Sequence, residues 1–259
     1  MAVPVQDIAR QLVAAEQQHA PLPPLTETYP ELTTGDAYAV QLAAIAHKIA
    51  RGARVVGKKI GLTSKVMQQM FAVDQPDYGH LLDTMAVASG GEAPMTRLLQ
   101  PRVEGEIAFL LKQDLHGPGV TEAQVLAATE AVMPAIEIID SRIRDWKIKL
   151  ADTIADNASS GLFVLGDTRT PVGHVDLRLV GMVLEKNGEL VGTGAGAAAL
   201  GNPAVSVAWL ANKLAEFGLG LNAGEVILSG SLAIAPPVTS GDVITVQFAQ
   251  LGSVMVKFV

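Results

Sequence analysis

The sequence of 259 residues contains no cysteine. This absence excludes disulfide bonds, thiolate nucleophiles and cysteine-ligated zinc. No apolar run reaches the ~18 residues of a membrane-spanning helix. The first ten residues show no charged segment followed by an apolar core, as a signal peptide would require. We therefore expect a soluble cytoplasmic protein with no membrane partner.

Aromatic residues are scarce, at 4% of the chain, whereas hydrophobic residues make up 49%. A chain this long buries about 70–75% of its unfolded surface, so aliphatic side chains must fill most of the core. Disorder is excluded by this composition. Lysine and arginine number 19 against 26 acidic residues, a net charge of −7. Because phosphate binding needs clustered cations, we expect no nucleic-acid partner.

The spacing of apolar residues changes near residue 50. Helical spacing predicts two helices within residues 1–50, separated by a Pro-rich segment, Pro21–Pro30, in which we expect no helix. Further along, Thr121–Val132 is predicted to be a helix, and strands dominate the rest. We expect a helical N-terminal region, residues 1–50, and a catalytic domain, residues 51–259.

Two carboxylates share one face of a predicted strand over residues 102–112. Glu104 and Glu106 have the same parity, so they lie roughly 6.5–7 Å apart along the strand. Glu137 lies in a second apolar strand, 135–139. Carboxylates in apolar strands are costly unless they are paired or bind a metal, and three of them suit Mg²⁺ or Mn²⁺. The alternative is an exposed edge strand with solvated glutamates.

Lys58 and Lys59 follow an apolar strand that begins at Val55. Alternation directs only one of the two toward the core side chains, where a lysine near carboxylates can act as acid, base or electrostatic clamp. From the residues alone, two solvated lysines are the simpler interpretation.

Two further patterns do not support a site. The glycine-rich run Gly192–Gly196 follows a predicted hairpin rather than opening a βαβ unit, so we expect a flexible loop and no dinucleotide site. No serine has an evident His–Asp partner, so a hydrolase triad is not expected.

Several short motifs occur together along the chain. They are Gly57–Ser64, Gln75–Gly79, Pro101–Phe109, Ile138–Arg142, Ala155–Gly161 and Ser229–Leu232. Together they resemble the hydratase/decarboxylase family of the fumarylacetoacetate hydrolase-like superfamily, and within it the 2-oxopent-4-enoate (2-hydroxypenta-2,4-dienoate) hydratases of aromatic meta-cleavage pathways. The resemblance covers nearly the whole chain. It implies an α+β fold, a mixed and curved β-sheet body with a helical N-terminal region.

The resemblance also implies roles for individual residues. The positions that match its divalent metal ligands are Glu104, Glu106 and Glu137. Lys59 matches the active-site lysine, and Asp77 matches an acidic residue of proton transfer, although an ordinary turn aspartate after Pro76 is the alternative. The positions in motifs that resemble substrate-binding ones are Asn157, Ser159 and Ser231. For these three, polar loop residues that bond their own backbone remain an equal alternative.

The implied activity is that of a hydro-lyase with Mg²⁺ or Mn²⁺. It adds water to 2-hydroxypenta-2,4-dienoate and gives 4-hydroxy-2-oxopentanoate. One alternative is decarboxylation of 4-oxalocrotonate (2-oxo-3-hexenedioate) on the same framework, and another is a non-catalytic partner subunit of such a decarboxylase. The resemblance further implies a homo-oligomer, a pentamer or decamer, and a complex with 4-oxalocrotonate decarboxylase.

Overall fold

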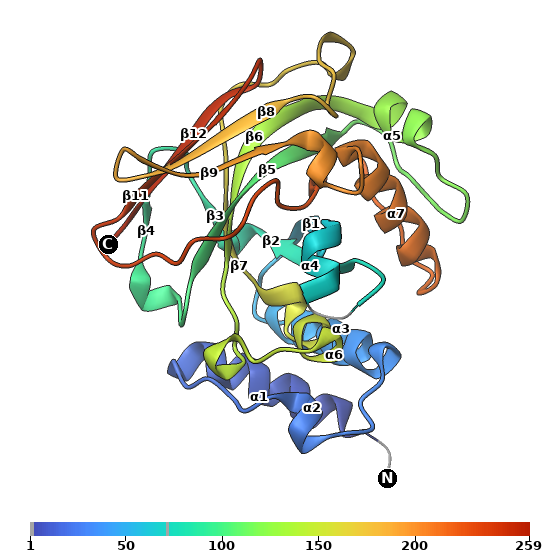
Figure 1. Ribbon diagram of the computed structural model, residues 1–259. Helices are drawn as coiled ribbons and strands as arrows, with labels where there is room; N and C mark the ends of the chain where they lie inside the picture. The colour runs from blue at the N-terminus through green and yellow to red at the C-terminus, as the bar shows by residue number, and fades with distance from the viewer. Residues whose placement is uncertain (1–2, 71–72) are drawn as a thin grey trace.

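The computed structural model describes residues 3–70 and 73–259, in which two β-sheets form a curved body and the N-terminal helices lie at one end of it (Figure 1). This is the α+β fold that the resemblance implied. No helix in the described ranges is both long and apolar enough to cross a membrane.

The larger sheet has seven strands in the order β2-β1-β10-β5-β6-β7-β3. Their bounds are β1 Val55–Gly61, β2 Asp77–Leu82, β3 Ala86–Val87, β5 Arg102–Leu111, β6 Thr129–Ile139, β7 Ser160–Leu165 and β10 Val226–Leu228. The pairs β1–β10 and β3–β7 are parallel, and the other pairs are antiparallel. The strand that carries Glu104 and Glu106 therefore lies between β10 and β6, and the edge-strand alternative is wrong. Asp77 begins a strand rather than lying in the predicted turn.

The second sheet has five strands in the order β4-β12-β11-β8-β9. Their bounds are β4 Glu92–Ala93, β8 Gly181–Lys186, β9 Glu189–Ala195, β11 Val243–Phe248 and β12 Gly252–Phe258. The two sheets approach closely at Gly105, where an added Cβ would lie 2.3 Å from Met182 Sδ. The predicted flexible loop at Gly192–Gly196 is wrong, because most of it belongs to β9, which pairs with β8.

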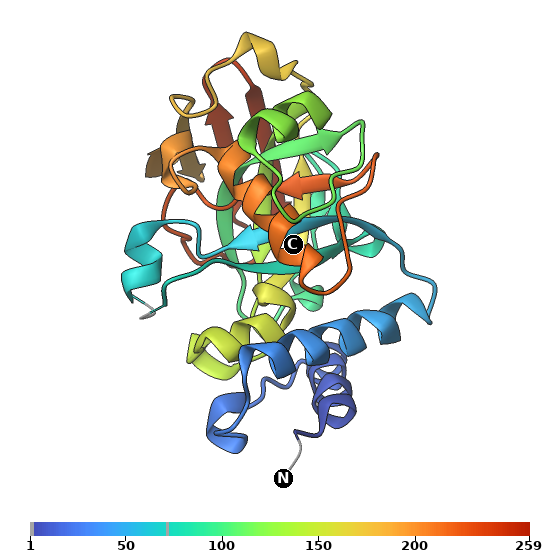
Figure 2. The same ribbon diagram turned by 90° about the vertical axis from the view of Figure 1, so that its right-hand side faces the viewer.

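Three helices precede the first strand and lie at the lower end of the body in Figures 1 and 2. They are α1 Val5–Gln18, α2 Leu25–Thr28 and α3 Thr34–Ile49. The first and third confirm the predicted pair, and Thr33 begins α3 with a capping box to Asp36. The prediction of no helix within Pro21–Pro30 is wrong. The single turn of α2 lies between Pro24 and Pro30 and contains no proline, so it loses no internal hydrogen bond.

The remaining helices flank the sheets. They are α4 Lys65–Met70, α5 Glu122–Ala128, α6 Leu150–Ala155 and α7 Pro203–Ala215. Helix α5 is shorter than predicted because β6 begins at Thr129, whose partner is Leu111 on β5. Helix α6 packs against α3 and connects the N-terminal helices to the strands that carry the candidate site.

Candidate active site

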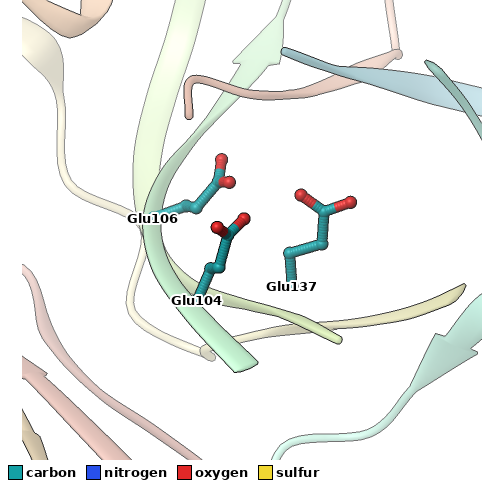
Figure 3. Close-up of side chains that lie close together, drawn as sticks. All are labelled: Glu104, Glu106 and Glu137. Atoms are coloured by element: carbon teal, nitrogen blue, oxygen red, sulfur yellow. The ribbon is translucent and has the colours of Figure 1, made fainter. Parts of the chain in front are cut away.

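Three glutamates from two neighbouring strands converge in the interior of the larger sheet's curve (Figure 3). Glu104 on β5 lies directly opposite Glu137 on β6, and Glu106 lies two residues further along β5. One carboxylate oxygen from each lies within 4.8 Å of the others. Glu106 and Glu137 are fully buried, whereas Glu104 is partly exposed. Side chains two residues apart on a strand point to the same face, so Glu104 and Glu106 share one face of β5, as the sequence predicts.

The protonation of these carboxyl groups is strongly shifted. Burial, followed by the charge of Glu137, raises the pKa of Glu104 to about 7. Burial and the charges of Glu137 and Glu104 raise the pKa of Glu106 well above its usual range. Burial also raises the pKa of Glu137, although the charge of Lys59 opposes it. Like charges this close resist joint ionisation unless a cation lies between them.

The hydrogen bonds of the glutamates leave several acceptors free. Glu106 Oε2 accepts a hydrogen bond from Gly230 N–H at 2.7 Å. Within the described part of the chain, Glu106 Oε1 and both carboxylate oxygens of Glu137 have no hydrogen-bond partner although they are buried. Oxygen ligands of this kind are what a hard divalent cation takes. The residues present therefore fit a divalent metal.

Lys59 lies on β1 and is 3% exposed. Its Nζ lies 3.3 Å from Glu137 Oε1, an ion pair outside hydrogen-bonding geometry. Burial alone would lower the pKa of Lys59, but the charges of Glu137 and Asp77 raise it, so the ammonium form is favoured. Lys58 points to the other face of β1 and donates to both carboxylate oxygens of Glu225 at 2.8 Å. Both lysines are buried, so the interpretation of two solvated lysines is wrong.

Asp77 is buried and lies across from Gly61 on β1. Its Oδ2 accepts a hydrogen bond from Thr153 Oγ1 at 3.1 Å, while Oδ1 has no partner among the described residues. A Cβ at Gly61 would lie 2.2 Å from Asp77 Oδ1 and 3.4 Å from Lys59 Nζ, so glycine leaves room for both groups. Burial raises the pKa of Asp77, although the charge of Lys59 opposes this.

The three predicted substrate-binding residues lie in different surroundings. The Asn157 side chain accepts from His80 N–H at 2.8 Å and donates to His80 carbonyl oxygen at 2.9 Å, so its amide is committed to β2. Ser159 Oγ lies 3.4 Å from Thr153 Oγ1, beside Asp77. Ser231 donates to Ala233 carbonyl oxygen at 2.7 Å, within its own loop, as the alternative interpretation expected.

The structure adds two groups that the sequence-based prediction missed. Thr153 contacts Asp77 across 76 positions, and no local pattern in the sequence indicates that contact. Gly230 lies in Ser229–Leu232, one of the motifs that carry the resemblance. The hydrogen bond from its N–H to Glu106, however, depends on how the loop after β10 returns to β5.

Comparison with known proteins places this arrangement in a family. Residues 55–259 match the family model described as fumarylacetoacetate (FAA) hydrolase C-terminal. The chain is 48% identical to 2-hydroxyhexa-2,4-dienoate hydratase of Comamonas testosteroni, over 98% of this chain and 97% of the relative. It is 54% identical to 2-hydroxypent-2,4-dienoate hydratase of Pseudomonas putida, over 83% of this chain and 97% of the relative.

A solved structure is similar over the same length. It is 4-oxalocrotonate decarboxylase from Pseudomonas putida G7 complexed with magnesium and adipate, with a TM-score of 0.96 and 43% identity. The match covers 98% of this chain and 97% of that one. The chain therefore belongs to the fumarylacetoacetate hydrolase family, alongside these hydratases and this decarboxylase.

Proposed function

We propose that the protein is a metal-dependent hydro-lyase that adds water to 2-hydroxypenta-2,4-dienoate and forms 4-hydroxy-2-oxopentanoate, a step in the degradation of aromatic compounds. One observation carries the proposal. Three glutamates converge beside Lys59, and two of them, Glu106 and Glu137, are buried with carboxylate oxygens that have no hydrogen-bond partner among the described residues. Asp77 lies close by. The identity of 54% to a 2-hydroxypent-2,4-dienoate hydratase supports the choice of substrate.

Glu104, Glu106 and Glu137 would hold the divalent metal, Mg²⁺ or Mn²⁺. A cation bound there supplies Lewis acidity, which withdraws electron density from the 2-oxygen of the substrate and stabilises negative charge on it. The backbone N–H of Gly230 orients Glu106 through its Oε2. Glu137 is oriented by its contact with Lys59.

Lys59 is proposed to bind the anionic end of the substrate. Its ammonium group is buried, and neighbouring carboxylates keep it charged. In a site shielded from water, such a charge attracts the substrate carboxylate or 2-oxygen more strongly than it would in solution.

Asp77 is proposed to move protons during the reaction. Protonation of the substrate at C5, with loss of the 2-hydroxyl proton, gives 2-oxopent-3-enoate. Water then adds with its oxygen at C4 and a proton at C3. Asp77 fits this work because burial raises its pKa, so that its carboxyl group takes up a proton more readily than a free aspartate does. In addition, Oδ1 has no hydrogen-bond partner among the described residues.

Ser159 and Ser231 are proposed to bind the substrate with their hydroxyl groups, and Asn157 to support the site through β2. Four further properties stay predictions. The division at residue 50 and cytoplasmic localisation are predicted from the sequence pattern, whereas assembly as a pentamer or decamer and a complex with 4-oxalocrotonate decarboxylase are implied by the resemblance.

A second candidate is decarboxylation of 4-oxalocrotonate. It is favoured by the TM-score of 0.96 to a 4-oxalocrotonate decarboxylase. The two reactions need the same metal ligands. They differ in the part of the pocket that contacts the end of the substrate distant from the metal, where 4-oxalocrotonate has a second carboxylate.

One experiment separates them. Purified protein is given freshly prepared 2-hydroxypenta-2,4-dienoate with Mg²⁺, with Mn²⁺ and with a chelator, and the loss of dienol absorbance and the product are followed. We expect metal-dependent formation of 4-hydroxy-2-oxopentanoate. Release of CO₂ from 2-oxo-3-hexenedioate without hydration of the dienol would move the assignment to the decarboxylase. Hydration that persists with chelator would contradict the metal site.

A further inference from the structure

The two carboxylate oxygens of Asp77 have unequal surroundings. Oδ2 accepts the Thr153 hydroxyl at 3.1 Å, and Oδ1 is buried without a partner among the described residues, on the side of Gly61 and Lys59. In this hydrogen bond the Thr153 hydroxyl is the donor and Asp77 Oδ2 the acceptor. Thr153 Oγ1 can then accept from Ser159, whose Oγ lies 3.4 Å away. The result is a directed chain of two hydroxyl groups that ends on Asp77.

Thr153 is itself held from outside the active site. It lies on α6, which the N-terminal helices fix at two neighbouring residues. The side-chain amide of Gln41 on α3 donates to Ile154 carbonyl oxygen at 2.8 Å. The Asp152 carboxylate accepts from Thr26 N–H at 2.9 Å and from Thr26 Oγ1 at 2.8 Å. Thr153 lies between these two anchors, so its hydroxyl has little freedom to move away from Asp77.

Ser159 is held by an unusual backbone. Asn157, Ala158 and Ser159 have φ of 57°, 50° and 52°, the left-handed region that residues with a Cβ rarely adopt. Such strain persists only where the surroundings determine it, and it gathers at functional sites. Here the Asn157 side chain bonds the backbone of β2, and the turn directs Ser159 toward Thr153.

We propose that Thr153 is a positioning residue, whose hydroxyl holds the Asp77 carboxylate in the orientation that leaves Oδ1 free for proton transfer. The inference rests on the proposed function, because it takes Asp77 as the residue that moves the proton. It goes beyond that function by assigning a role to a residue of α6 and, through α6, to the N-terminal helices.

The test uses full-length protein with Mg²⁺ and the dienol substrate. Thr153→Val keeps the branched shape and removes the donor, while Thr153→Ser keeps the donor. We expect Thr153→Val to lower kcat about 10–100-fold, because small misplacement of a reacting group is costly, and to change KM by less than about threefold. Thr153→Ser should keep at least about a third of the wild-type kcat.

Two controls separate positioning from packing. Thr129 is another buried threonine, whose hydroxyl donates to Val125 carbonyl oxygen at 2.7 Å outside the active site, so Thr129→Val should leave kcat unchanged. In an Asp77→Asn background, Thr153→Val should cause no further loss, because the group that it positions is already inactive.

The inference is overturned if Thr153→Val keeps the wild-type kcat, if Thr153→Ser is as slow as Thr153→Val, or if the losses add in the double variant. Should Thr153→Val not fold by circular dichroism, Thr153→Ala against Thr153→Ser gives the same comparison, and equal kcat values would overturn the inference. Wild-type protein that does not hydrate the dienol overturns the proposed function instead.

Discussion

Among the described residues, two clusters of buried charge can be compared, and they differ in how completely their hydrogen bonds are made. The first, the triad cluster, consists of Glu104, Glu106, Glu137 and Lys59. The second, the Arg142 cluster, consists of Asp140, Ser141, Arg142 and Asp156, and it lies where β6 and α6 end.

In the Arg142 cluster the charged groups are well partnered. The Arg142 guanidinium donates to the carboxylate and carbonyl oxygens of Asp156 and to Ser160 carbonyl oxygen. Asp156 Oδ2 accepts from Arg142 N–H at 2.9 Å, and the Asp140 carboxylate accepts from Leu99 and Gln100 N–H groups. Because its buried charges have this many hydrogen-bond partners, the Arg142 cluster has a structural role.

The triad cluster has three carboxylates, one lysine and three oxygens without a partner in the described ranges. Leaving buried acceptors unpaired costs free energy, and the cost is tolerated where a ligand supplies the missing partner. The contrast teaches that burial of charge does not by itself mark a binding site. Buried acceptors that lack a hydrogen-bond partner mark one.

The largest effect is expected from a substitution that removes one carboxylate of the triad cluster. Glu106→Gln should lower metal-dependent turnover by at least about a thousandfold, because a bound cation supplies several kcal/mol of charge stabilisation. The fold should be retained, since the change removes one of three repelling carboxylates. Steady-state kinetics and Mg²⁺ binding by calorimetry would measure this. The matched control is Glu225→Gln, a buried glutamate whose partner is Lys58, which should lose stability and keep Mg²⁺ affinity. Retained turnover in Glu106→Gln would sink the metal assignment.

Breaking the Arg142 cluster should show the opposite pattern. Arg142→Met leaves buried Asp156 without its cation, which should lower the free energy of unfolding by about 3–5 kcal/mol. Urea denaturation of metal-free protein would measure it. Mg²⁺ affinity of the folded variant should stay near the wild-type value. A stability loss below about 1 kcal/mol would show that the cluster is not the structural element described here.

Mg²⁺ should stabilise the folded protein by binding to the triad cluster, and this stabilisation should not depend on the Arg142 cluster. At a concentration of 100 times its Kd, Mg²⁺ should raise the free energy of unfolding by about 2.7 kcal/mol, because it binds only the folded state. Arg142→Met should gain as much as wild type, and Glu106→Gln should gain nothing. Equal stabilisation of Glu106→Gln and wild type would place the cation elsewhere.

The smallest expected effect is a loss of stability at low pH, caused by protonation of the buried, neutral His80 side chain. His80 Nδ1 lies 3.1 Å from Gln41 Oε1, and burial, with the charge of Lys58, lowers the pKa of His80 to about 4. Because the folded pKa lies below the unfolded value of about 6.5, stability is full above pH 6.5 and is lost as pH falls toward 4. Between pH 7.5 and 5 the loss should be about 2 kcal/mol. Urea unfolding across this range, wild type against His80→Gln, isolates the contribution. Parallel pH profiles would contradict it.

The sequence predicts the carboxylates of the triad well because strand alternation fixes which face they share. Glu104 and Glu106 have the same parity, and the apolar neighbours of Glu137 imply a second buried strand. It predicts Lys59 less directly, because alternation separates it from Lys58 without saying which of them faces the glutamates. That choice depends on which face of β1 meets the inner face of β5, and β10 lies between them.

Long-range contacts account for what the sequence could not predict. Helix α5 ends early because β6 pairs along β5 as far as Thr129, and tertiary pairing overrides the helical spacing there. Asp77 looks like a turn residue after Pro76, yet pairing with β1 makes it the start of a strand. Local propensity contains no information about either partner.

Strand β2, which begins at Asp77, has β1 on one side and, in the described part of the chain, no strand on the other. Two side-chain amides bond three of its backbone groups: Gln41 donates to Tyr78 carbonyl oxygen at 2.9 Å, and Asn157 bonds both backbone groups of His80. Unpaired groups on an outer strand invite a strand of another chain, which is a route to aggregation. Gln41 and Asn157 thus make hydrogen bonds that a neighbouring strand would otherwise make, and they oppose such pairing at the strand that contributes Asp77.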